Sequence, residues 1–197
     1  MSKKDVKEVL LETTKTLIKE HGYVTIKDIT THSYMNVAAV NYHFGSKDRL
    51  IEAVIIDVLD ELKVLISDRL LKTTKDENMT LLLADMLNVL YNFVAENAGI
   101  LKYLFLSIDN QLMSVNELFY RFFEDETFTE LVYKNLSHAI QSENPHELRA
   151  RYMIIFSGAI LPMLFSLLQI DEKVMEPYNN PEFRAAYIAQ LLRVVTA

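Results

Sequence analysis

Residues 37–47, with the sequence VAAVNYHFGSK, bring together the side chains of this chain that are best suited to contact nucleic acid. Small apolar residues come first and hydrogen-bonding residues follow: Val37, Ala38 and Ala39, then Asn41, Tyr42 and His43. Small apolar side chains allow a helix to lie close to base edges, and Asn, Tyr and His hydrogen-bond to bases or phosphates. This combination predicts a helix that contacts DNA.

Local signals place this helix within a pair of short helices joined by a tight turn. Thr25 begins the first helix with a capping box, in which its hydroxyl binds a backbone N–H while the acid three residues later reaches back. Asn36 is a suitable N-cap for the second helix, which runs to about Tyr42 before Gly45 breaks it. Such a pair lays its second helix in the major groove.

Ser46 caps a third helix, and Lys47 lies at its start. Backbone N–H groups at a helix start and a cation together suit a phosphate. The alternative interpretation is a helical hairpin whose polar residues are only solvated. The combination of caps, small residues and polar residues favours the interpretation as a DNA-binding unit.

The run V-N-Y-H-F-G-S-K-D-x-L after T-x-x-D-I resembles the DNA-binding domain of the TetR family of transcriptional regulators, over about residues 9–54. In that family the second helix reads the operator, and the lysine that matches Lys47 binds phosphate. Three features depart from the commonest family pattern. Asn41 stands where Tyr is usual, Thr13 and Thr14 replace small residues, and Tyr34 occupies a turn position usually held by Gly. A left-handed backbone at Tyr34 would cost roughly 1–2 kcal/mol.

The residues that we expect to contact DNA follow from the motif and from this resemblance. They are Thr25, Lys27, Asn36, Val37, Ala38, Ala39, Asn41, Tyr42, His43 and Lys47.

The composition of the 197 residues agrees with a compact helical protein, because half of them are hydrophobic and Gly and Pro are few. The chain has no Cys, which excludes disulfides and thiolate metal sites. Its net charge of −7 is unevenly distributed, because residues 1–50 hold eight Lys and Arg against six Asp and Glu. The acidic remainder would be held away from DNA while the first part faces it. The N-terminus does not resemble a signal peptide, and we expect a cytoplasmic protein.

Hydrophobic spacing and cap residues predict an all-α fold of about nine helices. The expected helices cover residues 3–21, then the short pair of which the first begins at Thr25 and the second covers residues 37–42, and then residues 47–72, 79–96, 99–107, 111–124, 126–142, 145–169 and 181–195, with approximate boundaries. We expect a three-helix DNA-binding domain at residues 1–46 and a larger effector-binding and dimerisation domain at residues 47–197. Helix 47–72 would link the two domains.

Residues 152–170 contain no charge and approach the length that spans a bilayer. Their Ser, Gly, Pro and Gln residues favour a helix buried between subunits instead. Pro162 should kink this helix, and Gly158 with Ala159 leaves a flat spot where another helix can approach closely.

The last two helices supply an apolar face that two copies could share as a four-helix bundle, the arrangement that the family resemblance implies. Its expected residues are Leu161, Leu164, Phe165, Leu168, Ile188, Leu191, Leu192 and Val195. A homodimer suits a palindromic operator, since two-fold DNA symmetry matches two-fold protein symmetry.

Aromatic and Met residues are concentrated beyond residue 86, where they form either ordinary core or an apolar pocket with a few polar groups. The resemblance implies a small effector of unidentified structure in this region. Its expected contacts are Met86, Leu90, Phe93, Tyr103, Ser107, Tyr120, Phe123, Met153 and Ser157.

No spacing of His residues indicates a metal site, and no phosphate-binding glycine loop or nucleophile elbow is present. We therefore expect no catalytic residues and no cofactor. The favoured function is a ligand-responsive homodimeric transcription factor, most simply a repressor. The alternative is a helical lipid- or ligand-binding protein whose N-terminal unit serves protein contacts.

Overall fold

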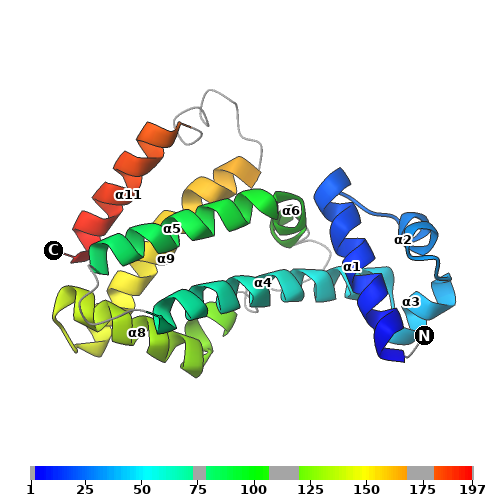
Figure 1. Cartoon of the computed structure of the whole chain (residues 1–197), viewed down its shortest axis with the longest axis horizontal. Helices are drawn as coiled ribbons and strands as arrows, with labels where there is room; N and C mark the ends of the chain where they lie inside the picture. The colour runs from blue at the N-terminus through cyan, green and yellow to red at the C-terminus, as the bar shows by residue number, and fades with distance from the viewer. Residues whose placement is uncertain (1–2, 73–78, 107–119, 168–179, 197) are drawn as a thin grey trace. The chain divides into compact units, whose positions relative to one another are not determined.

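The computed structural model describes residues 3–72, 79–106, 120–167 and 180–196, and every element among them is a helix (Figure 1). In chain order the elements are α1 (Lys3–His21), α2 (Ile26–Ser33), α3 (Val37–Phe44), α4 (Lys47–Leu71), α5 (Met79–Glu96), α6 (Ala98–Leu106), the π-helix η2 (Tyr120–Glu124), α8 (Glu126–Ile140), α9 (Pro145–Leu167) and α11 (Pro181–Thr196). The expected all-α fold is confirmed. The helix expected at residues 111–124 lies partly outside the described residues, which contain its last turn as η2.

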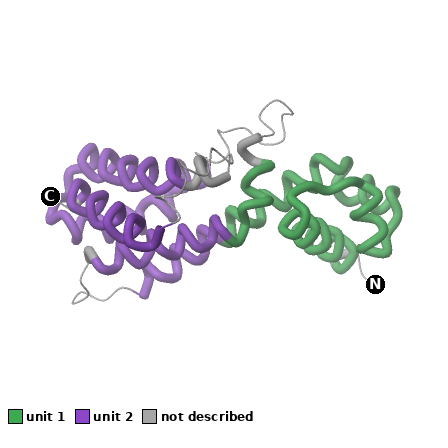
Figure 2. The backbone as a smooth tube through the Cα atoms, turned by 90° about the horizontal axis from the view of Figure 1, so that it is seen from above, with its two compact units in different colours: residues 1–61, 96–118 green, residues 62–95, 119–197 purple. Residues whose placement is uncertain are grey.

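The chain forms two compact units, which Figure 2 draws in different colours. Unit 1 comprises residues 1–61 and 96–118, and unit 2 comprises residues 62–95 and 119–197. Helix α4 therefore contributes its first part to unit 1 and its remainder to unit 2. Helix α6 belongs to unit 1, although its residues lie far from the other helices of that unit in the sequence.

Unit 1 is organised around α1, which contacts α2, α3 and α6. Its core contains Leu10, Ile18, Ile29, Val40 and Leu50, each with an exposed fraction of 0%. These side chains come from four successive helices, so each of α1 to α4 contributes to the apolar interior of unit 1.

Ion pairs of the buried Lys15 with two partly exposed acids join α1 to α4 within the same unit. The Lys15 ammonium lies 2.8 Å from an Asp57 carboxylate oxygen and also contacts Glu61. Burial by itself lowers the pKa of Lys15, but hydrogen bonds to both acids outweigh this effect and raise the pKa above its ordinary value. Lys15 is therefore charged at neutral pH and fixes α4 against α1.

Helix α6 approaches α1 closely at Gly99. A Cβ atom built on Gly99 would lie 2.6 Å from the carbonyl oxygen of Ile18, so only glycine allows this spacing without a shift of the backbone. Three residues after the end of α1, the Val24 N–H donates a hydrogen bond of 3.0 Å to the Tyr103 hydroxyl of α6. Helix α6 is thus attached both to α1 and to the segment that leads into α2.

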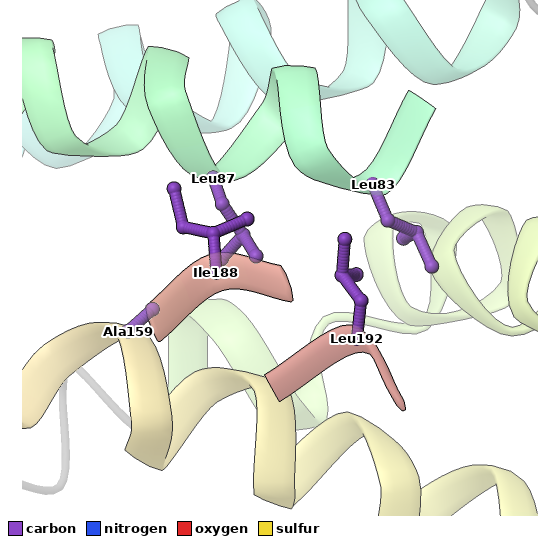
Figure 3. Packing of buried hydrophobic residues seen from close by; sticks show 5 residues of the cluster. All are labelled: Leu83, Leu87, Ala159, Ile188 and Leu192. Carbon is purple, nitrogen blue, oxygen red and sulfur yellow. The ribbon is translucent and has the colours of Figure 1, made fainter. Parts of the chain in front are cut away.

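Unit 2 has a core in which α5, α9 and α11 meet. Figure 3 shows its five buried residues, Leu83, Leu87, Ala159, Ile188 and Leu192. The flat spot expected at Gly158 is occupied by α11 of the same chain, because a Cβ on Gly158 would lie 2.7 Å from a Leu191 methyl carbon. The Tyr187 hydroxyl also donates to the Gly158 carbonyl at 2.7 Å.

A second cluster in unit 2 is aromatic. The ring of Phe123 packs against Tyr152 and Phe156, with centroid distances of 4.9 and 4.7 Å. The Tyr152 hydroxyl donates to the Phe122 carbonyl at 2.8 Å, and burial raises the pKa of this phenol well above its ordinary range. Helix α9 therefore holds η2 through both ring packing and a buried hydrogen bond.

Helix α9 continues through Pro162, and the kink expected there stays a prediction. Within the described parts of the chain, no helix has the length and hydropathy needed to cross a membrane.

Candidate nucleic-acid interface

Helix α2 begins with the capping box expected from the sequence. The Thr25 hydroxyl accepts the Asp28 N–H at 3.2 Å, and an Asp28 carboxylate oxygen accepts the Thr25 N–H at 2.9 Å. Hydrogen bonds from the Thr25 side chain and backbone lower the pKa of Asp28. These bonds satisfy two orphan N–H groups and fix where α2 starts.

The turn between α2 and α3 has an unusual backbone. Tyr34 ends α2 with φ 56° and ψ 28°, in the left-handed region that disfavours residues with a Cβ atom. Its side chain is 92% exposed. The left-handed turn anticipated from the motif is therefore made with a tyrosine in place of the usual glycine.

Helix α3 is fixed at both ends by local hydrogen bonds. The Asn36 side-chain oxygen accepts the Ala39 N–H at 2.9 Å, which caps the first turn. Gly45 has φ 84°, and its N–H donates to the Asn41 carbonyl at 2.9 Å. Val40 is fully buried in the core of unit 1 and determines which side of α3 faces outward.

The outward side of α3 exposes most of the residues expected to contact DNA. Val37 is 47% exposed and Tyr42 is 67% exposed, and Ala38 and Asn41 are also exposed. The His43 ring is half-buried and packs edge-to-face against Tyr42, with centroids 5.1 Å apart. The structure thus brings small apolar, amide and phenol groups together on one helix surface.

The start of α4 is capped as expected. The Ser46 hydroxyl accepts the Arg49 N–H at 3.1 Å. The Lys47 ammonium lies 3.9 Å from the Asp48 carboxylate, and 38% of the Lys47 side chain is exposed. This distance is at the long end for an ion pair, so Lys47 retains its capacity to bind an external anion.

Exposure divides the ten expected DNA contacts into two groups. Those with exposed side chains are Thr25, Lys27, Asn36, Val37, Ala38, Asn41 and Tyr42. Those that are half-buried are Ala39, His43 and Lys47. Tyr34 and Arg49 are also exposed next to this motif, with 73% of the Arg49 side chain exposed, and the sequence analysis assigned neither of them a DNA contact.

The expected effector contacts have different environments. Tyr103 lies in unit 1, where its hydroxyl accepts the Val24 N–H, and this contact gives it a structural role that the sequence did not indicate. Phe93 is buried, Met86, Leu90 and Phe123 are half-buried, and Ser157 is exposed. Tyr120 and Met153 are 60% and 51% exposed. Ser107 lies outside the described residues.

Two hollows in unit 2 are lined by residues other than the expected effector contacts. One of about 490 Å³ lies between α5 and α11, and its lining includes Asn88, Arg184 and Arg193. Another of about 480 Å³ lies between α4 and α8, beside the pair formed by Lys63 and Asp125 at 2.7 Å.

The residues expected at the dimer face have different environments within the single chain, and their role in dimerisation stays a prediction. Ile188, Leu192 and Val195 have exposed fractions of 9%, 4% and 0% within the single chain, so they are core residues. Leu191 is half-buried against Gly158. Among the residues of this face whose side chains the structure describes, only Leu161, which is 51% exposed, presents an apolar side chain outward. The side chains of Leu164 and Phe165, and the whole of Leu168, lie outside the described residues.

Exposed apolar side chains nevertheless occur along α9. Met153 and Ile154 are 51% and 39% exposed, and Leu161 follows two turns later on the same side of the helix. Among the described residues, no group of His, Cys, Asp and Glu side chains is arranged to hold a metal ion.

Comparisons with known proteins agree with this geometry. Residues 10–54 match the sequence model of a family described as "Bacterial regulatory proteins, tetR family". A tetR-family transcriptional regulator from Streptomyces coelicolor has a similar fold, with a TM-score of 0.65, 20% identity, and coverage of 99% of this chain and 80% of that chain. A putative TetR-family transcriptional regulator from Mesorhizobium loti MAFF303099 gives a TM-score of 0.69 at 13% identity and covers 98% of both chains. No curated protein matches the sequence of this chain.

Proposed function

Because this chain belongs to the tetR family of transcriptional regulators, we propose that it is a cytoplasmic repressor. It binds a palindromic DNA operator as a homodimer and is released by a small, largely apolar effector. Operator binding rests on the geometry of α3, dimerisation on the outer side of α9, and release on the connection between α5, α6 and α1.

The observation that carries DNA binding is the outward side of α3. Its sequence contains no carboxylate that would repel phosphates, and Val37, Ala38 and Tyr42 are exposed while Val40 anchors the opposite side. In helix-turn-helix proteins the second helix enters the major groove and the surrounding groups bind the DNA backbone. Here Lys27 of α2 and Lys47 of α4 lie on either side of α3 in the sequence and supply phosphate contacts.

Homodimerisation is supported by the exposed apolar residues of α9. Met153, Ile154 and Leu161 would bury their side chains against the same helix of a second copy, an isologous contact with two-fold symmetry. Two α3 helices must then reach half-sites separated by about 34–36 Å, which makes a palindromic operator the matching partner.

Effector release is proposed from the continuity of the chain between α5 and α6. Helix α5 of unit 2 leads through Asn97 directly into α6, and α6 is attached to α1 by the close approach at Gly99 and by the Tyr103–Val24 hydrogen bond. We propose that an apolar effector that packs among the rings around Phe123 in unit 2 lowers the affinity of the protein for its operator. A coupling free energy of about 1–3 kcal/mol, a change of roughly 5–150-fold in affinity, suffices for regulation.

Binding to the DNA that flanks the protein's own gene tests this proposal. We expect specific binding whose affinity falls as the salt concentration rises, because each phosphate contact releases a counterion. Lys47→Ala should weaken binding to all DNA sequences and reduce by about 1 the slope of the logarithm of the binding constant against the logarithm of the salt concentration. The control is Lys134→Ala, which removes an exposed lysine of α8 and should change neither the affinity nor the slope. Absence of DNA binding at low salt would contradict the proposal and favour a ligand-binding protein whose first unit contacts other proteins.

A further inference from the structure

The first turn of α3 presents side chains that lack hydrogen-bond donors and acceptors. Val37 is 47% exposed, and the neighbouring Ala38 is exposed as well. The Asn36 side-chain oxygen is already engaged as the cap of the helix, where it accepts the Ala39 N–H at 2.9 Å. The part of α3 that enters the groove first is therefore largely apolar.

Base pairs differ in how well they accept an apolar neighbour in the major groove. The C5 methyl of thymine is the one apolar group displayed there, whereas guanine and cytosine present acceptors and an amino donor. Covering those polar edges with Val and Ala removes their water without replacing its hydrogen bonds, which is unfavourable. A thymine methyl group in the same place gains apolar contact instead.

We propose that Val37 and Ala38 are specificity-determining residues that recognise thymine through its C5 methyl group. This inference rests on the proposed DNA-binding function and names the base that the first turn of α3 selects. Asn41 and Tyr42, one turn further along α3, carry the hydrogen-bonding groups for neighbouring bases or phosphates.

Selection from a random-sequence double-stranded DNA library by the full-length protein first identifies the binding site. Each thymine of the selected site is then replaced in turn by deoxyuridine, which keeps every hydrogen-bonding group of thymine and lacks only the methyl. We expect at least one thymine in each half-site where the replacement weakens binding about fourfold, the change expected from losing one buried methyl group.

Protein variants assign this effect to the first turn of α3. In Val37→Ala, the deoxyuridine penalty at the contacted thymine should fall to about twofold or less, because the two groups interact directly. The matched control is Val64→Ala, since Val64 of α4 is 60% exposed and should leave the penalty unchanged.

Two results would overturn the inference while leaving the proposed function intact. One is specific binding in which no thymine is sensitive to deoxyuridine. The other is a deoxyuridine penalty of full size in both Val37→Ala and Ala38→Gly, which would assign methyl recognition to other residues. Failure to select any sequence would instead overturn the proposed function itself, and the inference with it.

Discussion

Tyr34 offers a test of the turn on which the whole DNA-binding unit depends. Its left-handed backbone, with φ 56°, costs a residue with a Cβ atom about 1–2 kcal/mol. Replacement by glycine removes this strain but increases the entropy of the unfolded chain, which offsets about 0.5–1 kcal/mol. The ring is 92% exposed, so its loss removes little buried surface. We therefore expect Tyr34→Gly to be more stable than the parent by about 0.5–1 kcal/mol.

The sharper comparison is between Tyr34→Gly and Tyr34→Ala, because both remove the ring and only alanine keeps the strained Cβ. Glycine should be the more stable of the two by about 1 kcal/mol, and thermal unfolding should show a midpoint higher by about 2–4 °C. At Ala185, an exposed helical residue of α11, the order of stability should be the opposite. Ala185→Gly should be less stable than the parent by about 1 kcal/mol, because glycine is unfavourable within a helix.

A second left-handed residue provides an independent check. Gln141 ends α8 with φ 54°, and Gln141→Gly should stabilise the protein for the same reason. If alanine proved more stable than glycine at position 34, the turn in solution would not have the left-handed backbone, and the orientation inferred for α3 would lose its support.

Three further predictions concern packing, assembly and pH. Gly99→Ala should destabilise the protein by about 1–3 kcal/mol in chemical unfolding, because the new methyl group would meet the Ile18 carbonyl. Leu161→Asp should convert the proposed dimer to monomers in sedimentation experiments and weaken the proposed operator binding, since it places a charge in the proposed α9 interface. Asp125→Asn should cost about 0.2–1 kcal/mol at neutral pH by removing the ion pair with Lys63. Hydrogen bonds from Lys63 and a backbone N–H lower the pKa of Asp125, so its stabilisation is present above about pH 4 and is lost below it as the folded-state carboxyl protonates.

Each of these has a result that would contradict it. Gly158→Ala meets the end of a flexible side chain, so a cost equal to or above that of Gly99→Ala would refute the argument from a rigid backbone contact. Leu71→Asp, at a 69% exposed site of α4, should leave assembly unchanged, and a dimeric Leu161→Asp protein would place the interface elsewhere. If the difference in unfolding free energy between the parent and Asp125→Asn persisted unchanged at about pH 2, well below the ordinary pKa of a carboxyl group, the charge of Asp125 would not be its cause.

Helix starts were predicted well from the sequence because their cause is local. Asn144 and Asn180 accept N–H groups at the starts of α9 and α11, at 3.0 and 2.8 Å, as Thr25 and Asn36 do for α2 and α3. Each cap involves residues within three positions of one another, so no knowledge of the rest of the chain is needed. The left-handed turn at Tyr34 was instead anticipated from the family resemblance, because Tyr34 occupies a position usually held by Gly.

Contacts between distant segments were not predictable in this way. The periodicity of α11 shows that one side is apolar, but it does not say which helix covers it. Ile188 and Leu192 pack against α5 of the same chain, whereas the sequence suggested a second copy. Likewise, the hydrogen bond that Tyr103 makes with Val24 joins segments 79 residues apart, and no local pattern indicates it.

The candidate interface depends both on local hydrogen bonds and on contacts between distant segments. The caps and Gly45 define where α3 lies, so the position of this helix was predicted from the sequence, while its contacts with DNA stay a prediction. Which of its side chains point outward depends on the burial of Val40, and α3 packs against α1 in a tertiary contact. Ala38 is exposed and Ala39 is half-buried for that reason, although both are small residues in the same motif.

The binding of DNA by Ala38→Glu tests the central claim most directly. Ala38 is exposed on α3, and a carboxylate there would repel phosphates and meet base edges, while the matched variant Ala186→Glu places the same charge on an exposed site of α11. In fluorescence anisotropy with the selected DNA site, we expect the parent and Ala186→Glu to bind alike and Ala38→Glu to lose specific binding with its helicity and dimerisation unchanged. Undiminished affinity of Ala38→Glu would show that α3 does not enter the groove.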